Sequence, residues 1–422
     1  MQWKLRNDLS QIKSRKADRN AVVTESVQEI LKEVRANGDA AVRKYAEQFD
    51  GFVGKSLLVR EEELTSAVRN VGEDFMRILR RACGQITDFH ANQIAQSWGT
   101  YKDNGVIMGQ IARPLKRVVL YVPGGTAAYP STVLMNAIPA TLAGVKDIAV
   151  VTPVKADGKV ADMIIAAAMC CGIHTIYKVG GAQAIAAAAY GTETIAKADK
   201  IVGPGNIYVA TAKQLVYGEV DIDMIAGPSE ILIIADERAN PKYIAADLLS
   251  QAEHDELASA ILITTSERLM METEKEITRQ LAYLDRKEII ENSLKNYGAA
   301  ILVNDLDKAF EIANDMAPEH LEILTENPLE KLTKVQNAGS IFLGENTPEP
   351  LGDYMSGTNH VLPTGGTAKF YSPLGVYDFI KFSSYSYYPH DVLAEFKDDV
   401  IQFAELEGLS AHANSIRVRF QV

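Results

Sequence analysis

The chain has 422 residues, of which 47% are hydrophobic and 23% are charged, and its formal net charge is −12 at pH 7. These values are typical of a soluble globular protein that is long enough to form two or three domains around large apolar cores. The acidic balance argues against nucleic acid or an anionic membrane as a partner, because both favour a basic protein face. No apolar run reaches the ~18 residues that a membrane-spanning helix requires.

The first residues and the cysteines both predict a cytoplasmic location. Residues 1–8 lack the apolar stretch of a signal peptide. The three cysteines are too few, and odd in number, for a disulfide framework, and they suit a reducing compartment. Cys83 and Cys170 lie in apolar helical patterns and Cys171 precedes Gly172. We therefore interpret all three as buried structural residues rather than as nucleophiles.

The N-terminal part of the chain, up to Arg117, is predicted to be mainly helical. Apolar residues recur with helical spacing over residues 27–34, and a second amphipathic pattern covers residues 79–90. Thr24 is the predicted N-cap of the first of these helices, and Asn37-Gly38 is its predicted stop.

From Arg117 onward, short apolar runs alternate with Ala-rich helical segments such as residues 161–171 and 182–190. The predicted strands fall into two series, which cover residues 118–122, 148–152, 175–179 and 200–202, and then 231–235, 260–264, 300–303, 321–325 and 340–343. Strands that are apolar on both faces and are followed by helices indicate parallel sheets covered on both sides. The predicted fold class is therefore α/β, with two doubly wound, mostly parallel sheets of an incomplete Rossmann-like type.

After Pro373 the alternation fades, and the rest reads as a small C-terminal appendage. A helix is predicted over residues 392–407 and a β-like end over residues 415–422. The predicted domains are an N-terminal arm, a main α/β domain in two pieces, an inserted α/β domain and a C-terminal tail, with the bounds 1–20, 21–120 and 229–373, 121–228, and 374–422.

Glycine-rich turns follow three strands of the first series, namely Gly124-Gly125-Thr126, Gly180-Gly181-Ala182 and Gly203-Pro204-Gly205-Asn206. Taken singly, each is more often only a tight βα turn, and none has the G-x-G-x-x-G or P-loop pattern. Together they should meet at the carboxyl edge of one sheet, where a ligand can approach the backbone and helix N-termini. They favour a nucleotide-sized ligand in the inserted domain, with Tyr121, Gln183 and Asn206 as candidate polar contacts.

Four short polar segments of the second half concentrate acids and imidazoles, and they hold four of the seven histidines: residues 251–254, 317–320, 352–360 and 407–412. Such groups cost several kcal/mol to bury without partners, so their concentration predicts a metal-assisted acid–base site. Gln251 and His254 lie three apart at the end of a predicted helix and share a face. With Asp353 and His412 they give an N/O donor set that suits zinc with an open position, the alternative being a structural capping role.

Glu319 and His320 are adjacent to each other after Pro318, and they offer two proton-transfer groups of different basicity. The alternative interpretation of this pair is a solvated loop. We interpret the remaining histidines as structural, at a helix edge, a strand start and a tail loop: His90, His174 and His390.

These residues lie in long segments that resemble the histidinol dehydrogenase family. The segments are Tyr121-Val-Pro-Gly-Gly, Val179-Gly-Gly-Ala-Gln-Ala, Gly203-Pro-Gly-Asn, Ala226-Gly-Pro-Ser-Glu, Asp247-Leu-Leu-Ser-Gln-Ala-Glu-His, Pro318-Glu-His and Gly352-Asp-Tyr-Met-Ser-Gly-Thr-Asn-His-Val-Leu-Pro-Thr. The resemblance extends from about residue 20 to the C-terminus. It implies an NAD-dependent dehydrogenase that oxidises L-histidinol to L-histidine through histidinaldehyde, with two NAD⁺ and one Zn²⁺ per subunit, as the last step of histidine biosynthesis.

The resemblance also implies roles for individual residues. The implied zinc ligands are Gln251, His254, Asp353 and His412, and the implied proton acceptors are Glu319 and His320. The implied substrate contacts are Ser229, Gln251, His254, His320, Asp353, His360, Glu407 and His412. Tyr121, Gln183 and Asn206 are the implied NAD⁺ contacts.

The family resemblance further implies a homodimer in which Glu407 and His412, from the C-terminal dimerisation tail, complete the site of the partner chain. Two alternatives stay open at this point. One is a related zinc- and NAD-dependent dehydrogenase that acts on another small polar alcohol. The other is a catalytically silent protein that binds zinc or a nucleotide.

Overall fold

The computed structural model of the chain describes residues 9, 12, 21–54, 56–124, 128–155, 157–225 and 227–421. The chain divides into two compact units, the first made of residues 1–93 and 115–379 and the second of residues 94–114 and 380–422, and each is described by itself. The predicted N-terminal arm lies almost wholly outside the described residues, as do Gly125 and Thr126 of the first glycine turn and Ala226.

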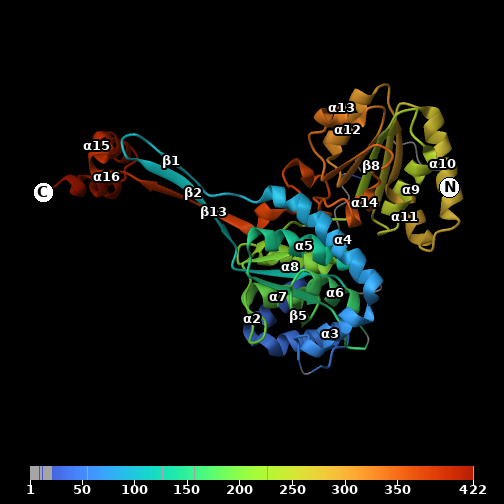
Figure 1. The fold of residues 1–422 in the computed structure, drawn as a ribbon, viewed down its shortest axis with the longest axis horizontal. Coiled ribbons are helices and arrows are strands. Elements are labelled where there is room, and N and C mark those ends of the chain that lie inside the picture. Colours follow the sequence, from blue (N-terminus) through green and yellow to red (C-terminus); the bar gives the residue numbers. More distant parts are fainter. Residues whose placement is uncertain are drawn as a thin grey trace. The chain divides into compact units, whose positions relative to one another are not determined.

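The first unit contains two five-stranded parallel sheets (Figure 1). The strands of the first sheet have the order β5-β4-β3-β6-β7, and they are β3 (Arg117–Tyr121), β4 (Asp147–Thr152), β5 (Thr175–Lys178), β6 (Lys200–Val202) and β7 (Asp221–Ile222). The chain starts in the middle at β3, moves outward to β5 and returns beside β3 as β6. The topological switch point of this sheet therefore lies between β3 and β6.

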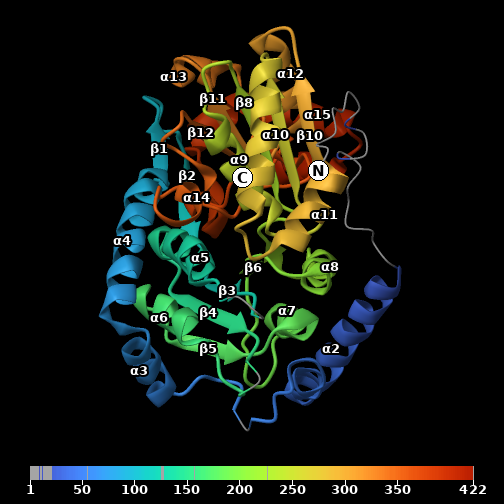
Figure 2. The ribbon, with the colours of Figure 1, turned by 90° about the vertical axis from the view of Figure 1, so that its right-hand side faces the viewer.

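Helices cover both faces of the first sheet (Figure 2). On one face lie α3 (Glu61–Asn70), α4 (Gly72–His90), α5 (Pro130–Ala143) and α6 (Asp162–Cys170), and on the other lie α2 (Ala21–Asp50), α7 (Gly181–Tyr190) and α8 (Ile207–Val216). Val118 and Leu120 of β3 belong to the first of these two cores, whereas Val119 and Tyr121 belong to the second. Burial on both faces explains why the strand is apolar throughout.

The second sheet has the strand order β10-β9-β8-β11-β12, and its strands are β8 (Glu230–Ala235), β9 (Ser259–Thr264), β10 (Gly298–Leu302), β11 (His320–Leu324) and β12 (Ser340–Leu343). One face packs against α9 (Pro241–Ala252), α10 (Glu267–Leu281) and α11 (Lys287–Tyr297), and the other packs against α12 (Leu306–Met316). Short elements complete the unit: η1 (Ala91–Gln93), α13 (Pro328–Lys331), η2 (Leu332–Lys334), α14 (Glu349–Tyr354), η3 (Thr367–Lys369) and η4 (Val376–Phe379). Both predicted series of strands and the α/β fold class are confirmed.

Polar side chains start several of these helices. Asn206, Asn240, Ser266 and Asp305 are the N-caps of α8, α9, α10 and α12, and each accepts a hydrogen bond from a backbone N–H of the first turn. The predicted N-cap at Thr24 is wrong, because Thr24 lies inside α2. The predicted break at Gly38 is confirmed, since its φ of 51° and ψ of −132° interrupt the helix.

Along the part of the chain that is described, no helix has the length and apolarity to cross a bilayer.

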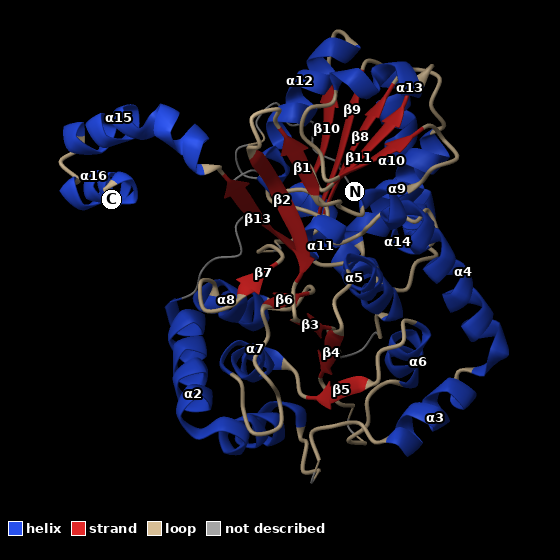
Figure 3. Ribbon diagram, turned by 60° about the vertical axis from the view of Figure 1, so that its left-hand side comes forward, coloured by secondary structure: helices blue, strands red, loops and turns tan. Residues whose placement is uncertain are grey.

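The second unit consists of a small antiparallel sheet and two helices (Figure 3). The sheet has the order β1-β2-β13, and it is followed by the helical tail: β1 (Trp98–Tyr101), β2 (Ile107–Pro114), β13 (Ile380–Tyr387), α15 (His390–Leu406), α16 (Ser410–Arg417) and η5 (Val418–Phe420). Residues 94–114, which the predicted bounds assign to the main domain, thus pair with the tail. The predicted β-like end is wrong because residues 415–420 are helical, and His390 begins α15 rather than lying in a loop.

A buried ion pair holds the third glycine turn in place. The side chains of Lys213 and Asp223 form this pair and are only 4% and 1% exposed. Lys213 Nζ also donates to the Gly203 carbonyl at 2.9 Å, and the Gly203 N–H donates to Asp223 Oδ2 at 2.7 Å. Gly203 has a φ of 115°, and a Cβ there would lie 2.1 Å from the Tyr121 carbonyl oxygen. The turn is therefore pressed against the end of β3, where only glycine fits.

We expect Lys213→Met to lower the free energy of unfolding by roughly 3–5 kcal/mol, because Asp223 is left buried without its counter-charge. The measurement is urea unfolding followed by circular dichroism. The double variant Lys213→Met/Asp223→Leu replaces the pair by apolar side chains and should recover most of the loss. A single variant as stable as the wild type would show that the pair does not contribute to stability.

Candidate active site

The candidate catalytic residues lie at the amino end of β11, which is next to β8, the central strand of the second sheet. β11 begins at His320, which is in register with Ile231 of β8, and Glu319 directly precedes it. Both candidate side chains are buried, with 7% of Glu319 and 5% of His320 exposed. Open α/β sheets usually bind ligands at the carboxyl ends of their strands. This sheet instead brings its candidate residues together at the opposite edge.

Glu230, the first residue of β8, fixes both candidate residues. Its carbonyl oxygen lies 2.9 Å from His320 Nδ1, and its N–H donates to Glu319 Oε2 at 2.9 Å. Because a carbonyl can only accept, Nδ1 carries the hydrogen and Nε2 keeps its lone pair. Burial lowers the pKa of His320 to about 4, so the imidazole is neutral at pH 7. His320 Nε2 is thus a proton acceptor in a fixed orientation.

The backbone around Glu319 is held by two unusual positions. Ala317 ends α12 in the left-handed conformation with a φ of 48°, which residues with a Cβ rarely adopt. Gly339 packs so closely that a Cβ there would lie 2.5 Å from the Glu319 carbonyl oxygen. The N–H groups of Gly339 and Ser340 donate to the carbonyls of Pro318 and Glu319 at 2.9 and 2.8 Å. This segment is therefore fixed by the start of β12.

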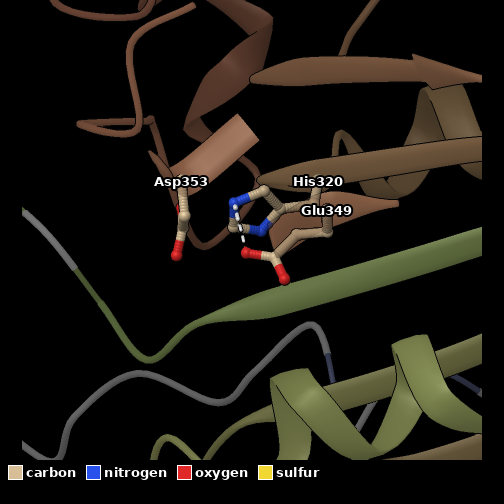
Figure 4. A group of neighbouring side chains, drawn as sticks. All are labelled: His320, Glu349 and Asp353. Carbon is tan, nitrogen blue, oxygen red and sulfur yellow. Dashed lines mark ion pairs between the residues drawn. The ribbon is translucent and has the colours of Figure 1, made fainter. Parts of the chain in front are cut away.

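Two carboxylates of α14 complete an acidic group around His320 (Figure 4). One ligand atom from each of His320, Glu349 and Asp353 lies within 4.8 Å of the other two, and among the described residues this is the group of histidines and acids that could hold a metal ion. His320 Nε2 lies 3.8 Å from Glu349 Oε1. Sequence reasoning missed Glu349, although its spacing of four residues from Asp353 places both carboxylates on one helix face.

The electrostatics of this group favour a cation. Burial raises the pKa of Glu319 well above its usual value, and the charges of Glu230, Asp353 and Glu349 act in the same direction. Burial, followed by the charge of Asp353, also raises the pKa of Glu349 to about 8. A cation bound beside these carboxyl groups would favour their ionised forms and lower their pKa values.

His254 and His360 belong to the same neighbourhood. His360 Nδ1 lies 3.1 Å from the Asp353 carbonyl, so it donates there and leaves Nε2 free. His254 follows the end of α9 and interacts electrostatically with both His320 and His360. Gln251 is 1% exposed, and neither atom of its amide has a hydrogen-bond partner within the described part of the chain.

A metal ion would satisfy the buried amide oxygen of Gln251, which is costly to leave without a partner. Together with His254 and Asp353 it gives the N/O donors that zinc accepts, so the residues present fit this metal. Ser229 directly precedes Glu230, and its carbonyl accepts a hydrogen bond from the Ser259 N–H at 3.0 Å.

The two remaining candidate residues belong to the second unit. Glu407 follows the last residue of α15, and His412 lies in α16. Both are exposed. The first unit contains the candidate residues from 229 to 360, and it contains neither of these two.

The candidate nucleotide contacts surround the switch point of the first sheet. Tyr121 ends β3, is 4% exposed, and accepts a hydrogen bond from the Gly181 N–H at 3.1 Å through its hydroxyl. Gln183 of α7 is 1% exposed, and its amide also has no hydrogen-bond partner among the described residues. Asn206 is exposed and caps α8. The turns after β3 and β6 flank the switch point, where such sheets bind nucleotides, so these residues fit NAD⁺.

Two other groups have structural roles. His90 is fully buried, with Nδ1 2.9 Å from the Ile86 carbonyl and Nε2 3.3 Å from the Asn359 amide nitrogen, which confirms the structural interpretation. The sulfur atoms of Cys83 and Cys170 lie 3.3 Å apart in a half-buried contact. That hydrogen bond, followed by burial, raises the pKa of Cys170, so its thiol is a weak nucleophile.

The sequence profile of the family described as histidinol dehydrogenase matches residues 13–420. A histidinol dehydrogenase of Lactococcus lactis subsp. lactis (strain IL1403) is 63% identical over 421 residues, which cover 99% of this chain and 98% of that protein. The one from Clostridium acetobutylicum is 56% identical over 410 residues, with coverages of 97% and 95%.

A solved structure gives the same result. The crystal structure of histidinol dehydrogenase from Elizabethkingia anophelis superposes with a TM-score of 0.94 at 38% identity, and it covers 100% of this chain and 98% of that one. The sequence resemblance is thereby confirmed in both sequence and fold. The chain belongs to the histidinol dehydrogenase family.

Proposed function

We propose that this oxidoreductase performs the zinc-dependent four-electron oxidation of L-histidinol to L-histidine through histidinaldehyde, with two NAD⁺, as the last step of histidine biosynthesis in the cytoplasm. The observation that carries the proposal is the neutral imidazole of His320, whose free Nε2 lies within a group of buried carboxylates. The relatives of this chain that are named histidinol dehydrogenases support the choice of substrate.

The chain offers places for both the metal and the nucleotide. The residues that would hold zinc are Gln251, His254 and Asp353, with His412 as a fourth. Tyr121, Gln183 and Asn206 would contact NAD⁺. When bound, zinc would hold and orient the substrate through its nitrogen atoms, and NAD⁺ would accept the hydride of each oxidation.

His320 acts as the proton acceptor of the first oxidation. Its Nε2 takes the hydroxyl proton of the alcohol while the carbon loses a hydride, and the product is the aldehyde. The hydrogen bond from Nδ1 to Glu230 keeps the ring in place throughout. The charge of Asp353 favours the imidazolium that forms, and the carboxyl oxygens of Glu319 and Glu349 lie 3.6 and 3.8 Å from its ring nitrogens.

Glu319 acts in the second oxidation. Its carboxylate takes a proton from a water molecule whose oxygen adds to the aldehyde carbon, while the His320 imidazolium gives its proton to the carbonyl oxygen. The hydrate forms, and Nε2 of His320 is again free to accept a proton. His320 then takes a hydroxyl proton of the hydrate while the second hydride leaves, and the carboxylic acid forms. No thiohemiacetal is required, so the chemistry does not use the three cysteines. Ser229, His360 and Glu407 are the proposed substrate contacts, and the carboxylate of Glu407 suits the cationic amine of histidinol.

We propose that the protein is a homodimer in which the second unit completes the site of the partner. The outer strands of its small sheet, β1 and β13, expose most of their residues, including Trp98 at 56% and Tyr101 at 73%. On α15, Phe403 is 66% exposed and Leu406 is 81% exposed. Large apolar side chains exposed in such numbers mark an interaction surface, and two-fold symmetry allows two tails to exchange partners.

The metal is expected to be essential. Removal of zinc by a chelator should abolish NADH formation from histidinol, and added zinc should restore it. His254→Asn should bind zinc more weakly, because a neutral imidazole is a better ligand than an amide. The measurements are NADH absorbance and metal content. Full activity of a verified metal-free preparation would contradict the role of zinc. Faster turnover of another polar alcohol in a substrate panel would favour a related dehydrogenase.

Glu319→Gln should separate the two oxidations. The variant loses the base that activates water but keeps His320, so oxidation of supplied histidinaldehyde should fall by about 10²–10⁴-fold and the alcohol step should fall less. Burial raises the pKa of Glu319. The active carboxylate form therefore increases with pH beyond the range of an ordinary glutamate, and the variant should lose this rise in rate. Equal losses on both substrates would contradict the division of roles.

The shared site is tested by complementation between two inactive variants. His320→Asn is defective in the main body, and His412→Asn is defective in the tail. A heterodimer of the two holds one site with both defects and one with neither. Mixing after reversible dissociation should therefore recover up to roughly a quarter of wild-type activity under two-fold symmetry with random pairing. Absence of recovery in demonstrated heterodimers would place His412 in the site of its own chain.

A further inference from the structure

Glu322 occupies a position in β11 where a parallel sheet normally carries an apolar side chain. Its neighbours in register are Ile233 of β8 and Phe342 of β12, and Ile233 is in turn in register with Leu262 of β9. Glu322 is completely buried. A carboxyl group in the middle of such a row is costly unless it has specific partners.

The carboxyl group of Glu322 has partners on two different helices. Its Oε1 accepts a hydrogen bond from the N–H of Glu349, the first residue of α14, at 2.8 Å. It also forms a side-chain hydrogen bond with Asp247 of α9, which is 8% exposed. Burial, followed by the charge of Asp247, raises the pKa of Glu322, so Glu322 holds the proton that the two carboxyl groups share.

Each of these contacts lies next to a residue of the active site. Asp247 is one helical turn before Gln251 in α9, and Glu349 is one turn before Asp353 in α14. Glu322 itself is two residues after His320, so both side chains point to the same face of β11. One buried carboxyl group therefore connects the three elements that carry Gln251, Asp353 and His320.

We propose that Glu322, paired with Asp247, is a positioning residue that ties α9 and α14 to β11 and thereby sets the zinc ligands Gln251 and Asp353 against His320. The inference rests on the proposed zinc-dependent function. It follows from geometry, because metal ligands bind tightly only when outer contacts hold them in place. Glu322 touches neither substrate nor metal in this role.

The test compares the zinc affinity of full-length variants, measured by competition with a chelating dye. Glu322→Leu removes both contacts and should weaken zinc binding by about 10–100-fold. Glu322→Gln is the matched control, because its amide can donate to Asp247 and accept from the Glu349 N–H. It should keep zinc affinity close to that of the wild type. Equal affinities of Glu322→Leu and the wild type would overturn the proposal.

A second comparison separates positioning from general stability, which is measured as the Tm of the metal-free proteins. The double variant Asp247→Leu/Glu322→Leu buries no unpaired charge, so its Tm should recover relative to Glu322→Leu while its zinc affinity stays low. Ser293→Ala removes a hydrogen bond of 2.8 Å to the Ala258 carbonyl in the core packed by α11. It should lower Tm without changing zinc affinity. Zinc affinity that follows Tm across all variants would reduce Glu322 to a structural residue.

If Glu322→Leu does not fold, Asp247→Leu replaces it in the zinc-affinity test. This variant removes only the contact between Glu322 and α9, and it leaves a neutral Glu322 in the core. It should also weaken zinc binding, and unchanged affinity would overturn the proposal. Zinc binding and histidinol oxidation by the wild type test the proposed function separately from the role of Glu322. A wild-type protein that oxidises histidinol without binding zinc would refute the zinc-dependent function itself, whatever the variants do.

Discussion

The candidate active site depends on one hydrogen bond between neighbouring strands, from His320 Nδ1 to the Glu230 carbonyl. Glu230 is the first residue of β8, and His320 is the first residue of β11. A strand that has just begun leaves its first carbonyl available to a side chain of the adjacent strand. This backbone contact fixes the tautomer and the orientation of the imidazole together, without another titratable side chain to hold it.

The buried carboxyl groups around His320 lower the stability of the folded protein when they ionise, although they form the candidate metal site. Burial raises the pKa of Glu319, Glu322 and Glu349, so their ionised forms are unfavourable in the folded protein without a counter-charge. The stability they contribute is therefore present at low pH and is lost as pH rises through these raised values. A bound cation would offset this loss, which couples folding of the site to its metal.

Much of the fold can be predicted from the sequence because the parallel strands are buried on both faces and are therefore apolar throughout. The outer strands of the second unit, β1 and β13, expose most of their side chains, so they carry no such signal and were missed. In the site, the adjacency of Glu319 and His320 and the spacing of Gln251 and His254 can be read directly. The roles of Glu230 and Glu349 cannot, because each depends on which strands and helices become neighbours in space.

The location of the site at the amino ends of β8 and β11 has a consequence for how this sheet can vary. The loops at its carboxyl edge, which begin at Asp236, Thr325 and Gly344, take no part in the candidate site. In most open α/β enzymes these are the loops that hold the substrate and constrain the sequence. Here they are the natural positions for insertions, affinity tags or new binding segments, while the opposite edge carries the candidate catalytic residues.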